Sequence, residues 1–332
     1  MDTITHALCG AAIGTAFFSG ANHRRAALIG AVLASLPDAD MAWRGIIAHR
    51  AETHAFFYMA LALPLLAEGT RRFIPAGRGR AWLMTALALF SHTILDILNS
   101  YGTQCLLPFS PAYVALDALP IVDPLLALPL LIALLAAIFT PAGRGVLAGR
   151  WAVGALLWSL LYCGWGLYAS AAARRIADTA LPAPQGVSAI HRANPLTGTT
   201  FIWRCARLSG NIATVGYIDV LRGRVLWHAN YPHEESPRVR EVLSATAPAL
   251  RTFLARSQGL WIAAEEGGNV VFRDLRYGIL SRPAEMLFAV IAVPQPQGGW
   301  QFVRQFPPAR RYYWHEELRA LWTAVCGKAN SR

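Results

Sequence analysis

Ionisable side chains occur in the first half of the chain at spacings that suit a divalent metal ion. His92 and Asp96 are four residues apart, which is about 40° around a helix, so both would face the same way. Asp38 and Asp40 follow Pro37, and this predicts a turn that leaves both carboxylates free. Imidazole and carboxylate ligands without thiolate are typical of sites for zinc or another first-row divalent ion.

Three further histidines and an arginine belong to the same set. His6 precedes the first apolar stretch, and His49, Arg50 and His54 precede the third. His49 and His54 are five residues apart and cannot share one helix face, so we expect His49 in a loop and His54 in the first turn of a helix. The predicted metal ligands are His6, Asp38, Asp40, His49, His54, His92 and Asp96.

Each of these residues has a structural explanation when it is considered alone. His6 could be an interfacial histidine, and Asp38 with Asp40 could form a solvated loop. The pair that is four residues apart could be a buried hydrogen-bonded pair, and Arg50 could anchor a lipid headgroup. Asp123 precedes a proline and is best explained as a helix cap. The convergence of four histidines and three aspartates favours a metal site over these separate explanations.

The composition indicates a membrane protein. Of the 332 residues, 55% are apolar and 15% are charged, whereas about a quarter of a typical soluble domain is charged. The apolar stretches of the first 171 residues are 7–19, 26–37, 55–67, 81–98, 121–139 and 151–170. The last two reach the roughly 20 residues that cross a ~30 Å hydrocarbon core. We therefore expect residues 1–171 to form a membrane all-α bundle of about six apolar helices that carries the metal site.

The arginines predict how this bundle is oriented. The loops 20–25, 68–80 and 140–150 carry eight arginines, and the loops on the opposite side carry only Arg44 and Arg50. Because basic loops stay in the cytoplasm, we expect a multi-pass protein with the metal-ligand candidates and everything after residue 172 on the outer side. Residues 1–3 contain no basic segment, so we do not expect a cleaved signal peptide.

The second half of the chain is more polar. Prolines and a glycine predict a linker over residues 172–198, and strand-like runs separated by helical spacing predict an α+β extramembrane domain over 199–332. This half holds 20 basic and 11 acidic residues, a net charge of +9, but it has no basic run with interleaved aromatics. We therefore expect membrane lipids rather than nucleic acid as partners. The five scattered cysteines exclude a zinc ribbon and a disulfide scaffold.

Five motifs occur in order in the first half: residues 1–6 (MDTITH), 36–40 (LPDAD), 49–54 (HRAETH), 91–96 (SHTILD) and 101–110 (YGTQCLLPFS). Residues 1–170 thereby resemble the YdjM-type membrane-bound metal-dependent hydrolases, a family associated with the bacterial inner membrane. The chain departs from the family at Ala51 and Ala55, where glycine and serine are usual. The loss of a serine hydroxyl could alter a hydrogen bond behind a ligand.

The histidines, aspartates and His-x3-Asp pair are more distantly similar to zinc-dependent phospholipase C and P1 nuclease, which are multi-zinc phosphoesterases. These resemblances imply a membrane-bound metal-dependent hydrolase whose substrate is a phospholipid or another phosphoester, lipid-linked ones included. The cofactor would be zinc, as one or two ions or more. Asp38 would ligate, bridge two ions or act as a base, and Arg50 would hold the phosphate with its planar fork.

Two other functions fit the sequence. The first is a non-enzymatic membrane protein with a structural or sensing metal site and a binding C-terminal domain. Transport of the metal is disfavoured because the polar residues gather at one face instead of following a path across the bilayer. The second is a C-terminal domain that binds a protein or a cell-wall polymer, with the bundle as an anchor. Nothing in the sequence indicates an oligomeric state.

Overall fold

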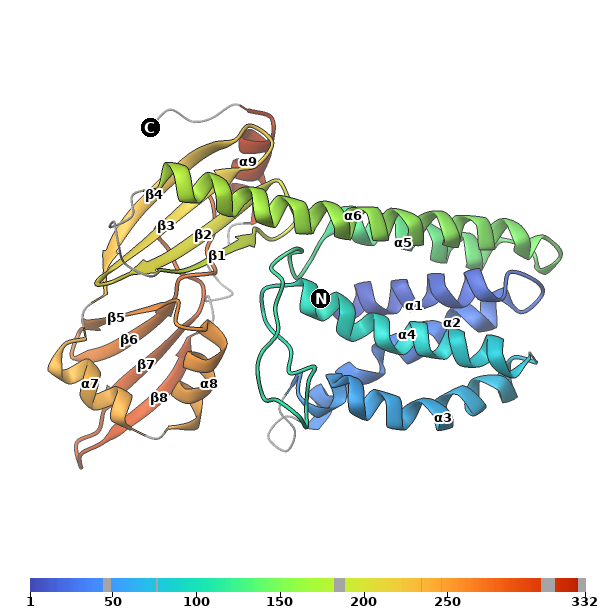
Figure 1. Cartoon of the computed structure of the whole chain (residues 1–332), viewed down its shortest axis with the longest axis horizontal. Coiled ribbons are helices and arrows are strands. Elements are labelled where there is room, and N and C mark those ends of the chain that lie inside the picture. The colour runs from blue at the N-terminus through green and yellow to red at the C-terminus, as the bar shows by residue number, and fades with distance from the viewer. Residues whose placement is uncertain are drawn as a thin grey trace. The chain divides into compact units, whose positions relative to one another are not determined.

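The structure is a computed structural model that describes residues 1–43, 49–75, 77–181, 189–233, 235–245, 247–305 and 314–327. The chain divides into two compact units (Figure 1). The first unit comprises Met1–Leu167 with Thr197–Thr199, and the second comprises Tyr168–Leu196 with Thr200–Arg332. Four features predicted from the sequence lie partly or wholly outside the described residues: Arg44, linker residues 182–188, the strand end at Phe306 and the helix start at Tyr313.

The first unit is helical. Its helices are α1 (Thr3–Phe17), α2 (His23–Ser35), α3 (Phe56–Phe73), α4 (Arg78–Leu98), α5 (Pro124–Phe139) and the first part of α6 (Gly145–Ala180). Three short 3₁₀ segments join them: η1 (Leu36–Trp43), η2 (Glu52–His54) and η3 (Ala142–Arg144). In Figure 1, helices α1 to α4 run side by side, so the turns after α1 and α3 lie at one end of the unit and η1 lies at the other.

Glycines allow α1 and α2 to pack with their backbones in contact. A Cβ atom on Gly10 would lie 2.1 Å from the carbonyl oxygen of Gly30, and a Cβ on Gly30 would lie 2.0 Å from the carbonyl oxygen of Gly10. Any larger residue at either position would force the helices apart. This close crossing, followed directly by η1, holds the start of α1 near the end of α2.

Carboxylates cap the two shorter apolar helices. Asp2 accepts a hydrogen bond from the backbone N–H of Thr5 at the start of α1 (2.9 Å). Asp123 accepts from the N–H of Leu125 at 3.0 Å and receives the Tyr162 hydroxyl at 2.9 Å. The interpretation of Asp123 as a helix cap is therefore confirmed.

The expectation of a membrane bundle with about six apolar helices is wrong. Helices do form over the predicted stretches, but among the described residues only Ala142–Ala180, which contains α6, is long and apolar enough to cross a membrane. Helix α1 has 15 residues and would extend about 22 Å, short of a ~30 Å core. Helices α3 and α4 are longer, but their ends carry Glu68, Arg71 and Arg80. The apolar runs in the sequence thus predicted where helices form, but they did not show that each helix spans a membrane.

The expected α+β domain is also corrected, because the second unit is β-rich. Its first sheet has the order β1-β2-β3-β4, and its second has the order β5-β6-β7-β8; every neighbouring pair is antiparallel. The strands are β1 (Ala189–Pro195), β2 (Ile202–Ser209), β3 (Ile212–Asp219), β4 (Arg224–Pro232), β5 (Trp261–Glu266), β6 (Asn269–Asp274), β7 (Ala289–Pro294) and β8 (Trp300–Gln305). Helices α7 (Pro237–Ser244), α8 (Pro248–Ser257) and α9 (Trp314–Val325) accompany them.

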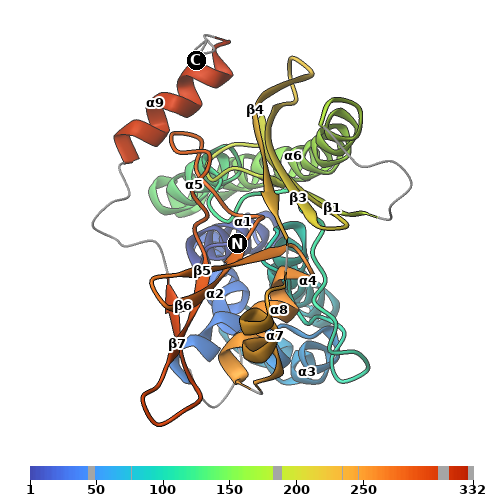
Figure 2. The ribbon, with the colours of Figure 1, turned by 90° about the vertical axis from the view of Figure 1, so that its left-hand side faces the viewer.

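Helices pack against both sheets, and α9 packs Ala324 against Ile202 and Tyr217 of the first one. The C-terminal part of α6 lies against the first sheet, where Arg207 pairs with Asp178 and the Cys205 thiol contacts the carbonyl oxygen of Ala173. Helices α7 and α8 lie along the second sheet, as Figure 2 shows, and bury Val242 and Leu250 against its strands. Strand β1 and the end of α6 fall within the stretch predicted as a linker.

Candidate metal centre

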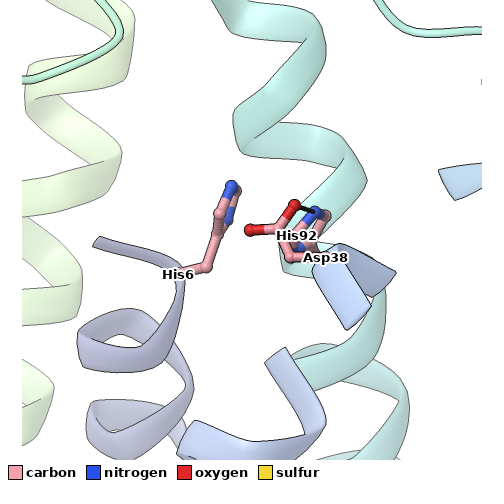
Figure 3. A group of neighbouring side chains, drawn as sticks. All are labelled: His6, Asp38 and His92. Atoms are coloured by element: carbon pink, nitrogen blue, oxygen red, sulfur yellow. Dashed lines mark ion pairs between the residues drawn. The ribbon is translucent and has the colours of Figure 1, made fainter. Parts of the chain in front are cut away.

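Four elements of the helical unit bring the predicted ligands to one end. His6 lies in the first turn of α1, Asp38 in η1 and His54 at the end of η2, while His92 and Asp96 occupy the last turns of α4. Figure 3 shows His6, Asp38 and His92 converging from α1, η1 and α4. Residues that are up to 90 positions apart in the sequence therefore share one cluster.

The ligand atoms of the cluster lie close enough to share a metal ion. Three groups of three residues each have all their ligand atoms within 4.8 Å of one another. The groups are His6 with Asp38 and His92, Asp38 with His49 and His54, and His54 with His92 and Asp96. The His92 Nε2 atom is 3.6 Å from both Asp38 Oδ1 and Asp96 Oδ2. The His54 Nε2 atom is 3.5 Å from the same two oxygens. The His6 and His92 rings stack with their centroids 3.7 Å apart.

The cluster is buried and its inward-facing atoms lack hydrogen-bond partners. The side chains of His6, His54, His92 and Asp96 are 0% exposed, and that of Asp38 is 7% exposed. Within the described residues, the Nε2 atoms of all three histidines and Asp96 Oδ2 make no hydrogen bond. Buried polar atoms are costly when unpaired. A divalent ion would satisfy several of them at once, so these residues fit a metal.

Hydrogen bonds behind two of the histidines turn the correct nitrogen inward. His92 Nδ1 is 2.6 Å from the carbonyl oxygen of Ala34, which can only accept, so Nδ1 carries the proton and Nε2 presents its lone pair. His54 Nδ1 is 2.9 Å from the hydroxyl of Thr53, which itself donates to Asp40 Oδ2 at 2.8 Å. The His54 Nδ1–H therefore donates to the hydroxyl oxygen, and Nε2 is again free to ligate.

Asp40 and His49 occupy the outer side of the cluster. The Asp40 carboxylate accepts from the Thr53 hydroxyl, from the backbone N–H of Arg50 at 3.3 Å and from His49 Nδ1 at 2.8 Å. The His49 side chain is 28% exposed. The geometry thus gives Asp40 the role of orienting its neighbours, and direct ligation by Asp40 stays a prediction.

The guanidinium of Arg50 lies inside the cluster. Its Nη2 atom is 3.0 Å from Asp96 Oδ1, its Nη1 donates to Asn99 Oδ1 at 3.1 Å, and it stacks 4.7 Å from the centre of the Tyr101 ring. The α-amino group of Met1 also contacts Asp96. Arg50 has a φ of 66°, in the left-handed region that costs a non-glycine residue about 1–2 kcal/mol. Such strain persists only where surrounding contacts fix it.

The carboxylate of Asp38 is held ionised. Burial opposes its ionisation, but the nearby His54 and His92 rings and the hydrogen bond from the Thr3 hydroxyl outweigh burial and hold its pKa well below the usual range. The Thr3 hydroxyl donates to Asp38 Oδ2 at 2.6 Å. A metal cation binds a carboxylate in its ionised form, and this is the form that Asp38 presents to the three imidazoles.

The sequence reasoning did not assign roles to three polar residues of the site. Thr3 and Thr53 lie inside the motifs but were not considered as site residues, although each binds a carboxylate of the cluster. Asn99 holds both the Arg50 guanidinium and the backbone N–H of Tyr101. Its position three residues after Asp96, at the end of α4, was the available signal.

The chain is similar in sequence to two known bacterial proteins. The chain is 36% identical over 107 residues to inner membrane protein YbcI of Escherichia coli, covering 30% of this chain and 61% of that protein. It is 33% identical over 141 residues to the uncharacterized protein YfhP of Bacillus subtilis, covering 37% of this chain and 42% of that one. The chain thus spans less than two thirds of either relative.

No solved structure matches the chain. The model of the YdjM inner membrane protein family matches residues 1–173, just over half of the chain, and all the residues of the buried cluster lie in that part. This confirms the resemblance drawn from the five motifs, while the more distant likeness to phospholipase C and P1 nuclease stays a prediction. The chain belongs to the YdjM inner membrane protein family.

Proposed function

We propose that the chain is a metal-dependent hydrolase of the inner membrane that acts on a phosphoester. The observation that supports this proposal most is the convergence, beside Asp38, of three imidazole Nε2 atoms and Asp96 Oδ2, which make no hydrogen bond within the described residues. In the proposed site His6, His54, His92, Asp38 and Asp96 hold one or two divalent ions, zinc being favoured by the nitrogen-rich ligand set. His49 lies at the exposed rim.

The metal ion, Asp38 and Arg50 have different tasks in this proposal. A divalent ion bound here would polarise a phosphoryl oxygen and lower the pKa of water. Asp38 acts as a ligand, because its carboxylate lies 3.5 Å from His54 Nε2 and 3.6 Å from His92 Nε2. Arg50 binds a phosphoryl oxygen when its guanidinium leaves Asp96, since arginine matches the geometry of phosphate.

The proposed substrate is a phosphate ester at the outer face of the membrane. The cluster lies at the end of the helical unit opposite the loops that carry Arg24, Arg71 and Arg144. Helix α6, the one described helix long and apolar enough to cross, begins at the same end as these basic loops, so its crossing would leave the basic end in the cytoplasm and the cluster on the outer side. The partly exposed His49 gives the buried cluster a side from which a lipid-linked or free phosphoester could approach.

Metal content tests the site first. Elemental mass spectrometry of the detergent-purified chain is expected to find one or two zinc ions per chain. His92→Gln and Asp96→Asn should each lose most of that metal, and His228→Gln, a histidine of β4 outside the cluster, should keep it. Metal-dependent hydrolysis of a phosphodiester to a phosphomonoester and an alcohol by the wild type, absent in His92→Gln, tests the activity. Equal metal in all four proteins would contradict the site.

Burial supports a second candidate, a metal that stabilises or senses without catalysis. Four of the five central side chains are fully buried, and structural sites are closed by protein whereas catalytic sites keep a position for water. Under this alternative the wild type binds metal but hydrolyses no phosphoester, and metal removal lowers the unfolding temperature as much as His92→Gln does. The two measurements together separate the candidates.

A further inference from the structure

A groove in the helical unit is separate from the metal cluster. It has a volume of about 630 Å³ and lies between the end of α1, the start of α4 and the middle of the first part of α6. Its walls are apolar apart from one cation; they are formed by Ala16, Phe17, Gly79, Arg80, Leu83, Val153, Leu156, Leu157 and Leu160. All of these residues belong to the first unit.

Several apolar side chains of the groove are largely exposed, which is unfavourable in water. Leu83 is 53% exposed, Leu157 56% and Leu160 71%. The wall formed by α6 extends from Val153 to Leu160, about 10 Å along the helix axis. An apolar occupant would stabilise a surface of this kind, because removing apolar side chains from water is favourable.

The cation of the groove has no acidic partner among the described residues. Arg78 and Arg71 both pair with Glu68, but no such ion pair forms at Arg80, which instead lies 5.0 Å from the centre of the Phe18 ring. Arg80 lies in the first turn of α4, at the end of the unit where the arginine-bearing turns meet. A positive charge at the end of an apolar groove complements a ligand with an anionic head and an apolar tail.

We propose that this groove binds one anionic phospholipid, with an acyl chain along α4 and α6 and the phosphate at Arg80. The family to which the chain belongs is one of inner membrane proteins, so such a lipid is available at this surface. The binding involves none of the residues of the metal cluster. It is therefore independent of the proposed hydrolase activity.

Native mass spectrometry of the full chain tests this site. The protein, delipidated in a neutral detergent, is titrated with phosphatidylglycerol and in parallel with phosphatidylcholine. The wild type is expected to bind one phosphatidylglycerol in preference to phosphatidylcholine. Arg80→Gln should lower the affinity for phosphatidylglycerol about tenfold, which is the loss typical of one charge-assisted contact. The variant should then no longer prefer phosphatidylglycerol to phosphatidylcholine. Arg150→Gln removes the same charge near the same end but outside the groove, and should bind as the wild type does.

A filled groove tests the acyl-chain position. A side chain added at Gly79 points into open space, so Gly79→Leu should occupy the groove without disturbing the fold and abolish the lipid adduct. Gly154→Leu adds the same side chain to open space outside the groove and should retain the adduct. The proposal is overturned if Arg80→Gln and Gly79→Leu bind phosphatidylglycerol like the wild type, if the control variants lose it equally, or if the wild type forms a dimer and no lipid adduct.

Discussion

The metal cluster depends on side chains that do not themselves face the ion. Thr53 connects Asp40 to His54, and the carbonyl of Ala34 fixes the proton of His92. Each of these bonds sets which ring nitrogen is free, and a histidine in the wrong tautomer cannot ligate. We therefore expect these outer residues to set the affinity of the cluster for a metal to which they would make no bond.

Replacing Thr53 tests this control. Thr53→Val keeps the shape of the side chain but removes the hydroxyl between Asp40 and His54, so we expect the affinity for zinc to fall about 10–100-fold. Thr53→Ser restores the hydroxyl and should recover most of that affinity. Competition for zinc with a chromophoric chelator measures both variants. Equal zinc affinity in Thr53→Val and wild type would mean that the Thr53 hydroxyl does not position His54.

The site could be predicted from the sequence to the extent that helical periodicity and local motifs define it. The four-residue spacing of His92 and Asp96 placed both on one face, and both enter the cluster. The role of Asp40 depends on its contacts with His49 and Thr53, and that of Asn99 on its contact with the Arg50 guanidinium, and no local pattern encodes such contacts. Apolar runs likewise predicted where helices form, but whether a helix spans depends on its length and on the charges at its ends.

At the scale of elements, the crossing of α1 and α2 sets the geometry of the cluster. His6 begins α1 and Asp38 follows α2, so the distance between these residues depends on how closely the two helices approach. Gly10 and Gly30 make that approach possible, since each would collide with the backbone of the other helix if it carried a Cβ atom.

Gly30→Ala should therefore disturb both stability and metal binding. Alanine favours an isolated helix over glycine by about 1 kcal/mol, but the added methyl group would sit 2.0 Å from a carbonyl oxygen, and overpacking of this kind costs about 1–3 kcal/mol. We expect a lower unfolding temperature in detergent and less bound zinc. Gly69→Ala, in α3 with open space around it, should be neutral or stabilising. Unchanged zinc content in a destabilised Gly30→Ala would show that the crossing does not set the site.

At the scale of the whole molecule, α6 is shared between the two units. It begins beside the arginine-bearing turn at Arg144 and ends at Ala180, where the β-rich unit takes over. It is the one described helix long and apolar enough to cross. If it crosses, the basic turn and the sheets must lie on opposite faces, and the positive-inside tendency places the sheets outside.

Cysteine accessibility tests this orientation. Cys326, after α9, is exposed, whereas Cys9, Cys105 and Cys205 are buried. A maleimide that cannot cross membranes should label the wild type in spheroplasts and fail to label Cys326→Ser. Gly143→Cys in the Cys326→Ser background lies in an open turn at the start of α6 and should be labelled only after permeabilisation. The reverse pattern would place the β-rich unit in the cytoplasm. Labelling of both cysteines from the same side would mean that α6 does not cross, because it is the one helix between them, in the described part of the chain, that is long and apolar enough to do so.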